Sequence, residues 1–129
     1  MPGEGWLVRG EGSYEFGYES AIHILDGPSD ARPTAIIAFN DLMAIGVIEG
    51  ARSIGLQAGI DFAVTGFDDA PFTQYLNPPL TTVRQPVWEI GERAIELLLN
   101  ILNGRVGASQ QILVAPELVI RRSSDFRLG

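Results

Sequence analysis

The sequence contains no cysteine and no lysine, and its only histidine is His23. Without cysteine the chain has no disulfide, no thiolate metal ligand and no cysteine nucleophile, a composition that fits a reducing compartment. All nine cationic residues are arginines, and 16 acidic residues bring the formal net charge to −7. Because nucleic-acid affinity comes from clustered basic groups that neutralise phosphates, we expect this chain not to bind DNA by itself.

A long hydrophobic run is also missing. No apolar run approaches the ~20 residues that cross a bilayer. Residues 1–16 carry acids and glycines, whereas a signal segment has a basic region followed by an apolar one. We therefore expect a soluble, cytoplasmic protein with no membrane partner. Its 129 residues are enough for one domain with one core.

Strand and helix patterns alternate along the chain. The continuous apolar runs at residues 35–39 and 62–67 are typical of parallel strands covered on both faces. Helices are predicted at residues 14–25, between a cap at Asn40 or Asp41 and Gly55, at 86–103 and, as a short helix, around 70–75. Further strands are predicted at residues 6–9, 80–84, 110–114 and 118–120. This order predicts an α/β fold, a parallel sheet flanked by helices.

Polar pairs follow the two apolar strands. Asn40 and Asp41 come after residues 35–39, and Asp68 and Asp69 come after residues 62–67. In open α/β sheets, ligands bind beyond the carboxyl ends of the strands. A carboxylate accepts hydrogen bonds from hydroxyl groups, and an amide both donates and accepts. Asn40 and Asp68 are therefore candidate ligand contacts; equally, both residue types cap helices on any fold.

The predicted helix at residues 86–103 is apolar on more than one face. Such a helix needs partners on two sides, and the chain offers few strands to cover it. This pattern indicates either a subunit interface or contact with a part of the molecule outside this chain. The apolar residues concerned are Val87, Trp88, Ile90, Ala94, Ile95, Leu97, Leu98, Leu99, Ile101 and Leu102.

Four separated motifs carry a family resemblance. They read AFNDLMAIG, DFAVTGFDD, PPLTTVRQPVWEIGERAIELLL and LVIRRSS, in this order, within a region from about residue 6 to 122. The region resembles the C-terminal part of the effector-binding region of LacI/GalR-type transcription regulators. The resemblance implies a periplasmic-binding-protein-like fold, in which crossover strands join two α/β subdomains around a ligand cleft. It further implies a fragment that lacks the helix-turn-helix and most of the N-terminal subdomain.

The same resemblance divides the chain and assigns ligand contacts. Residues 1–80 correspond mainly to the C-terminal subdomain, residues 81–115 to a crossover strand and a helix of the second subdomain, and residues 116–129 to the return strand and tail. Asn40 and Asp68 then contact a sugar or related metabolite. Asp41 and Asp69 are interpreted as acids at helix starts, where they favour the local dipole.

Two further positions keep alternatives open. The family's ligand-stacking aromatic lies in a segment that is two residues shorter here, at residues 12–18. Tyr14 either takes the stacking position or lies one turn into the helix as an ordinary helix-face aromatic. Gln85 either faces the cleft or caps the helix that Pro86 opens.

The sequence lacks the combinations of residues that an enzyme active site needs. A catalyst requires a nucleophile with its base, an acid–base pair or a metal cluster, and His23 has no second ligand at metal spacing. Adjacent Asp68 and Asp69 would point apart in an extended segment. The absent lysine argues against a phosphoacceptor domain, and no G-x-G-x-x-G follows a strand. We expect a non-catalytic sensing domain without cofactor, with a small-molecule effector, a homodimeric partner and DNA contact only through a module absent from this chain. The alternative is a fragment of a periplasmic-type sugar-binding protein.

Overall fold

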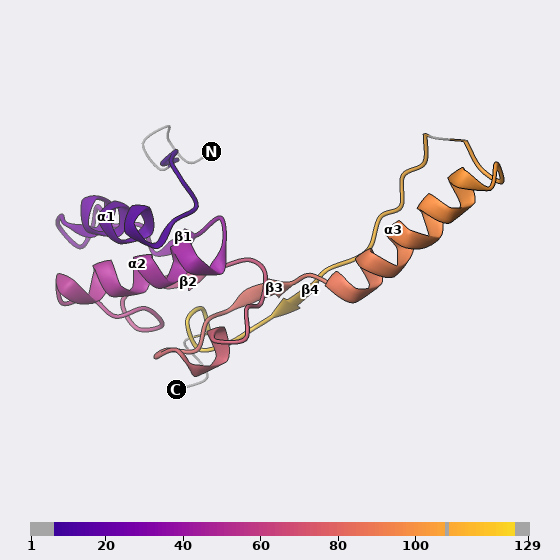
Figure 1. The fold of residues 1–129 in the computed structure, drawn as a ribbon. Helices are drawn as coiled ribbons and strands as arrows, with labels where there is room; N and C mark the ends of the chain where they lie inside the picture. Colours follow the sequence, from indigo (N-terminus) through magenta and orange to yellow (C-terminus); the bar gives the residue numbers. More distant parts are fainter. Residues whose placement is uncertain (1–6, 108, 126–129) are drawn as a thin grey trace.

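The computed structural model describes residues 7–107 and 109–125. The elements in chain order are helix α1 Tyr14–Leu25, strand β1 Ala35–Ile37, helix α2 Asp41–Ser53, strand β2 Ala63–Thr65, the 3-10 helix η2 Thr73–Tyr75, strand β3 Thr82–Arg84, helix α3 Val87–Leu102 and strand β4 Glu117–Val119 (Figure 1). β1 pairs in parallel with β2, and β3 pairs antiparallel with β4. Parallel bridges from Thr65 to Thr81 and from Asp68 to Arg84 place β3 alongside the end of β2. The predicted α/β fold with a parallel sheet and helices is confirmed.

Local signals start and end the first two helices, and the cap of α1 at Ser13 adds one that was not predicted. The hydroxyl oxygen of Ser13 accepts the Phe16 N–H at 3.2 Å before α1. Gly55 follows α2 with a φ of +84°, a conformation that glycine adopts without steric cost. The helices cross closely because small residues lie between them: a Cβ atom at Gly46 would lie 2.1 Å from the Tyr14 carbonyl oxygen.

The hydrophobic core lies between these two helices and one face of the sheet. Its members come from α1, from α2 and from the sheet, and they include Ala21, Leu25, Ala44, Val47, Ile48, Phe62, Val64 and Leu80. The strand predicted at residues 35–39 was expected to be covered on both faces, but β1 is covered on only one. Ala38 is buried, whereas Ile37 is 86% and Phe39 77% exposed, because α2 packs on one face of the strands and α1 packs on α2.

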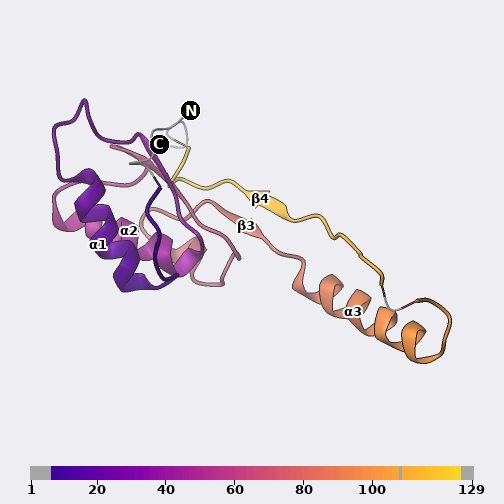
Figure 2. The ribbon, with the colours of Figure 1, turned by 90° about the horizontal axis from the view of Figure 1, so that it is seen from above.

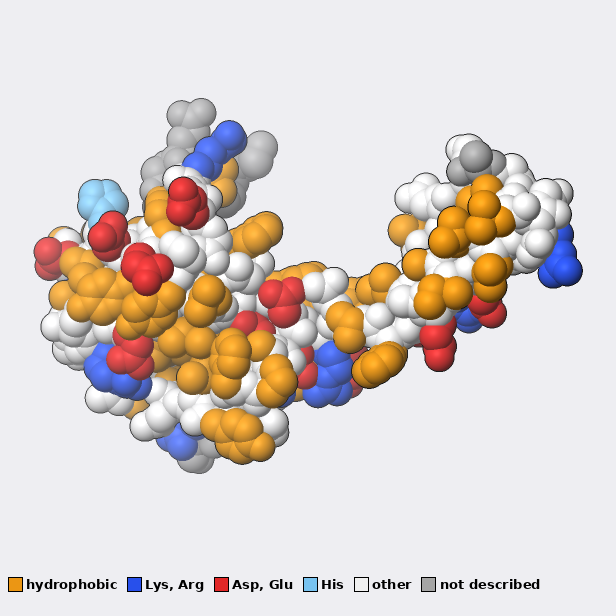
Figure 3. Space-filling view, in the orientation of Figure 1, with side chains coloured by type: hydrophobic (Ala, Val, Ile, Leu, Met, Phe, Trp, Pro, Cys, Tyr) orange, Lys and Arg blue, Asp and Glu red, His pale blue; other side chains and the backbone are white. Residues whose placement is uncertain are grey.

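Helix α3 stands apart from the rest of the chain. Figures 1 and 2 show it at the far end of an arm formed by β3 and β4. None of its residues is buried, and Trp88 is 87% exposed. Hydrophobic side chains gather on its surface (Figure 3). The described chain therefore leaves the broad apolar surface uncovered, as its composition predicted. No described helix has both the length and the apolar character needed to cross a membrane.

Two predicted strands are not found among the residues that the structure describes. Residues 110–114 have no strand. The strand predicted at residues 118–120 forms as β4, Glu117–Val119, directly after Pro116, where it has β3 as a neighbour. Of the strand predicted at residues 6–9, Trp6 lies outside the described residues and residues 7–9 are irregular. A strand requires a hydrogen-bonded partner, and no described segment pairs with either stretch. Pro86 directly precedes α3, at the N-cap position and without a capping hydrogen bond, whereas it was predicted at the first helical position.

Candidate functional site

Three predicted site residues follow strands at one edge of the sheet. β1, β2 and β3 run in the same direction, so Asn40, Asp68 and Gln85 all lie beyond carboxyl ends. The start of α1 joins them, because the Asn40 side-chain Nδ2 donates to the Gly12 carbonyl oxygen at 2.9 Å. The structure therefore brings the segments that carry all four predicted residues, Tyr14 included, to this edge, which we call the strand-end site.

Asp68 and Gln85 contact each other at the strand-end site. Gln85 Nε2 donates to Asp68 Oδ1 at 2.7 Å, and the Asp68 N–H donates to the Val83 carbonyl at 2.9 Å. Neither η2 nor α3 has a side-chain cap, so the capping alternatives for Asp68 and Gln85 are wrong. Within residues 7–107 and 109–125, Oδ2 of the exposed Asp68 accepts no hydrogen bond. Its φ of 120° is rare outside glycine, and such backbone outliers cluster at functional sites.

Asn40 has a structural role in addition to any ligand contact. Its Oδ1 accepts the Met43 N–H at 2.8 Å and caps α2, while Nδ2 holds the segment before α1 through Gly12. A Cβ atom at Gly12 would lie 2.9 Å from Nδ2, so glycine permits this approach. One amide N–H and a second lone pair on Oδ1 remain for a ligand.

Tyr14 is the first residue of α1, directly after the Ser13 cap, and not one turn inside the helix. Its ring stacks on Tyr18 with centroids 6.3 Å apart and an interplanar angle of 29°. Glu15 and Glu19 line an open depression of about 320 Å³ with these two rings. This arrangement is that of a helix-face aromatic, and a ligand contact by Tyr14 stays a prediction.

Asp41 lies buried behind the strand-end site, only 2% exposed. Its carboxylate accepts the Thr82 hydroxyl on β3 and the Ala70 N–H, the latter at 2.8 Å. Burial raises the pKa of Asp41, although both hydrogen bonds act in the opposite direction. Asp41 is in the first turn of α2 as predicted, but its side chain joins α2 to β3. A Cβ atom at Gly66 would lie 2.3 Å from Asp41 Oδ1.

The prediction that Asp69 is a helix-start acid is wrong. Its carboxylate accepts from Arg121 Nη2 at 2.8 Å and from Arg84 Nε at 2.6 Å. Burial acts to raise the pKa of Asp69, but the hydrogen bonds from Arg121 and Arg84 outweigh it and hold that pKa below its usual range. Arg84 also pairs with Glu117 across the β3–β4 ribbon at 3.2 Å. This network was not predicted, because the partners of Asp69 lie 15 and 52 positions away and a single sequence does not show which distant residues meet.

The acidic side chains of the strand-end site are not arranged as a catalytic pair or as a metal site. Asp68 and Asp69 have different partners and share no hydrogen bond, so they do not form an acid–base pair. Within the described part of the chain, no group of three His, Cys, Asp or Glu residues is arranged to hold a metal ion. The strand-end site offers an exposed carboxylate and two side-chain amides, which suit a ligand with hydroxyl groups.

Comparison with known proteins assigns the family. The periplasmic binding protein-like domain matches residues 7–124. The chain belongs to this family. Within it, the chain is similar to the effector-binding region of LacI-type regulators, as the motifs predicted. The HTH-type transcriptional repressor CytR of Escherichia coli (strain K12) is 38% identical over 119 residues, which make up 92% of this chain and 34% of CytR. The chain thus spans about a third of the length of the curated relatives that it matches.

Solved structures agree with this assignment. A regulatory protein of the LacI family from Chloroflexus aggregans superposes with a TM-score of 0.90 and 48% identity, covering 97% of this chain and 44% of that one. The Lac repressor dimer, solved with its operator and the anti-inducer ONPF, superposes with a TM-score of 0.78 and 29% identity, covering 87% of this chain and 38% of that one. The relatives are transcriptional regulators and not enzymes.

Proposed function

We propose that this chain is the C-terminal part of the effector-binding region of a LacI-type transcription regulator, and that it holds a sugar or related polar metabolite at the strand-end site. The observation that carries the proposal is Asp68. It is exposed at the carboxyl ends of the strands, with one oxygen held by Gln85 and the other without a protein partner among the described residues. Asn40 and Gln85 supply amide groups beside it, and Tyr14 supplies an aromatic ring at the start of α1.

The fold supports a division of the chain into parts of two subdomains. In this proposal residues 1–80 belong mainly to the C-terminal subdomain, residues 81–115 supply a crossover strand and a helix to the second subdomain, and residues 116–129 return. β3 and β4 are then the crossover strands, and α3 stands apart because its neighbours belong to the second subdomain. The whole protein would contact DNA through a helix-turn-helix outside this chain, act in the cytoplasm as a homodimer and catalyse no reaction.

Gln85 connects ligand binding to the second subdomain. It directly precedes Pro86 and α3, and it donates its amide to the carboxylate that would bind the ligand. A ligand hydroxyl that donates a hydrogen bond to the Asp68 carboxylate changes the hydrogen bond between Asp68 and Gln85. A ligand that binds the closed arrangement of the two subdomains better than the open one shifts the equilibrium, the dimer geometry and the operator affinity.

Calorimetric titration of the whole regulator tests this proposal. A panel of monosaccharides, disaccharides and nucleosides would first identify the effector. Asp68→Ala should then weaken its binding by about 1.5–3 kcal/mol, the value of a hydrogen bond to a charged group, which is about tenfold or more in Kd. Asp30→Ala, an exposed carboxylate in the loop after α1, is the matched control and should leave Kd unchanged. A folded Asp68→Ala protein with the wild-type Kd would contradict the assignment of Asp68.

The alternative of a periplasmic-type sugar-binding protein shares this fold. The relatives favour the regulator, because proteins with about 40% identity over most of the chain are named transcriptional repressors. The same residues would bind the sugar in either protein.

A further inference from the structure

A second cavity, of about 450 Å³, lies at the opposite edge of the sheet from the strand-end site. α2 begins at Asp41, directly after its cap Asn40, and ends at Ser53, and Arg52 from its last turn lines this cavity. A helix of 13 residues is roughly 20 Å long, so the two sites lie about one helix length apart. None of Asn40, Asp68 and Gln85 lines the cavity, which we call the arginine pocket.

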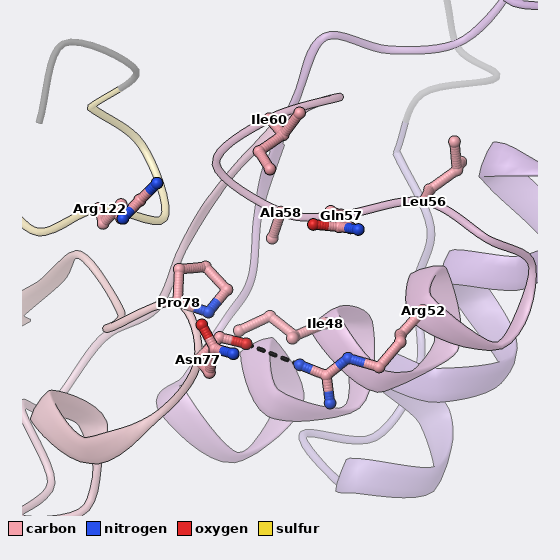
Figure 4. Close-up of a pocket in the computed structure, with 9 residues that line it drawn as sticks. All are labelled: Ile48, Arg52, Leu56, Gln57, Ala58, Ile60, Asn77, Pro78 and Arg122. Carbon is pink, nitrogen blue, oxygen red and sulfur yellow. Dashed lines mark hydrogen bonds between the residues drawn. The ribbon is translucent and has the colours of Figure 1, made fainter. Parts of the chain in front are cut away.

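The residues that line the arginine pocket include basic but no acidic side chains, although the chain as a whole is acidic. Two of the nine arginines of the chain, Arg52 and Arg122, line it, and none of the lining residues is acidic. They lie on opposite sides of the pocket (Figure 4). Among the described residues, the side chain of Arg122 makes no hydrogen bond or ion pair. Its charge is therefore available to a ligand.

Arg52 is held in place by the protein. Its Nη2 donates to the Asn77 carbonyl oxygen at 2.6 Å (Figure 4). Its Nη1 pairs with Glu49, one turn earlier in α2. A guanidinium group has five N–H donors, so several remain free. The ion pair with Glu49 offsets part of the charge of Arg52, which makes Arg122 the stronger attraction for an anion.

We propose that the arginine pocket binds a small organic oxyanion, a carboxylate or phosphate ester with an apolar body. The planar fork of arginine matches both oxyanions. The side-chain amides of Gln57 and Asn77 add hydrogen-bonding groups, and Ile48 and Leu56 form an apolar wall. The cavity volume falls in the ~300–1,000 Å³ range of small-molecule sites.

A ligand in this pocket would join the C-terminal segment of the chain to α2. Arg122 follows β4, and its neighbour Arg121 makes the ion pair with Asp69. Asp69 in turn adjoins Asp68 of the strand-end site. Through this chain of contacts, an anion bound in the arginine pocket would shift the positions of the same crossover strands from the opposite edge of the sheet. The pocket would thus be a second regulatory site that responds to an anion.

Titration of the purified protein with phenyl phosphate and benzoate, followed by calorimetry and by amide NMR shifts, tests the proposal. Benzyl alcohol serves as the uncharged control. We expect saturable binding of at least one anion, and the preferred one identifies the head group. Arg122→Gln should weaken that binding about tenfold or more, because it removes a charge-assisted hydrogen bond. Arg105→Gln, an exposed arginine after α3, should leave it unchanged.

Three results would overturn the proposal. The first is the absence of saturable binding up to about 10 mM, because a Kd above this concentration is weaker than that of ordinary metabolite sites. The second is binding of benzyl alcohol as tight as that of the anions. The third is an unchanged Kd for the anion in Arg122→Gln. Because Arg122 has no protein partner among the described residues, its substitution should leave the fold intact, which circular dichroism can verify. Asp68→Ala should retain anion binding in this pocket, so the two proposed sites can fail independently.

Discussion

Replacing Asp69 with asparagine should lower the free energy of unfolding by about 2–4 kcal/mol. The side chains of Arg121 and Asp69 are only 16% and 9% exposed, so removing the carboxylate leaves a poorly hydrated guanidinium. Breaking a buried pair in this way costs ~3–5 kcal/mol. The figure is lower here because Arg121 keeps its hydrogen bond to the Leu80 carbonyl at 2.7 Å. The second pair adds at most about 1 kcal/mol, because Arg84 is 49% exposed.

Urea unfolding followed by far-UV circular dichroism measures this loss. Glu117→Gln is the matched control, because it removes a surface partner of the same Arg84, from a side chain that is 67% exposed. That variant should lose less than about 1 kcal/mol. If Asp69→Asn lost no more than Glu117→Gln, the network around Arg121 would not be stabilising the junction between β3 and the C-terminal segment.

The pH dependence gives the same reasoning a second test. The pKa of Asp69 is lowered in the folded state, so its contribution is present above the unfolded value of ~3.9 and is lost as pH falls through the folded value. The stability difference between wild type and Asp69→Asn should therefore shrink between pH 5 and pH 3 (about one unit on either side of the unfolded pKa). The raised pKa of Asp41 works in the opposite direction: its contribution is lost as pH rises from ~3.9 through the folded value, and both proteins share it.

Two further predictions concern close packing and the surface of α3. Gly66→Ala should lower the free energy of unfolding by about 1–3 kcal/mol, because the added Cβ would lie 2.3 Å from Asp41 Oδ1. The control is Gly91→Ala on α3, where a Cβ meets nothing within 4 Å, and it should be neutral or stabilising by up to ~1 kcal/mol. Equal losses of the two variants in urea unfolding would contradict this prediction. The 129-residue chain should self-associate through α3, since burying even ~400 Å² of apolar surface favours association by about 10 kcal/mol before entropic costs. Light scattering of wild type and of an Ile95→Asp, Leu98→Asp double variant checks this, and a folded wild-type monomer at about 50 µM would refute it.

Local patterns in the sequence were sufficient for the helices. The spacing of apolar residues predicted α1 with the bounds that the structure has, and the cap at Asn40 and the turn at Gly55 bounded α2. These signals act within a few residues of the chain. The strand-end position of Asn40 and Asp68 was also predictable, because it follows from the direction of parallel strands and not from any particular contact.

Long-range features were not predictable from one sequence. Whether residues 110–114 form a strand depends on a neighbour, and the segment has none among the described residues. The exposed faces of Ile37 and Phe39 likewise depend on what covers β1, which an apolar run does not specify. The pairing of Asp69 with Arg121 joins residues 52 positions apart, and composition gave no reason to choose Arg121 over another arginine.

The contrast between Asp68 and Asp69 explains why adjacent identical residues have different roles. Both have positive φ values, 120° and 55°, so the chain turns sharply after β2. The turn places Asp69 among the guanidinium groups of Arg84 and Arg121, where its carboxylate is held from several sides. It leaves Asp68 exposed beside Gln85, with acceptor capacity to spare. Because Asp69 fixes the turn, it also fixes the direction of Asp68, so a substitution at Asp69 should disturb ligand binding indirectly. Weaker ligand binding by a variant identifies a direct ligand contact only where the free energy of unfolding of that variant is unchanged. Asp68→Ala meets this condition better than any substitution at Asp69.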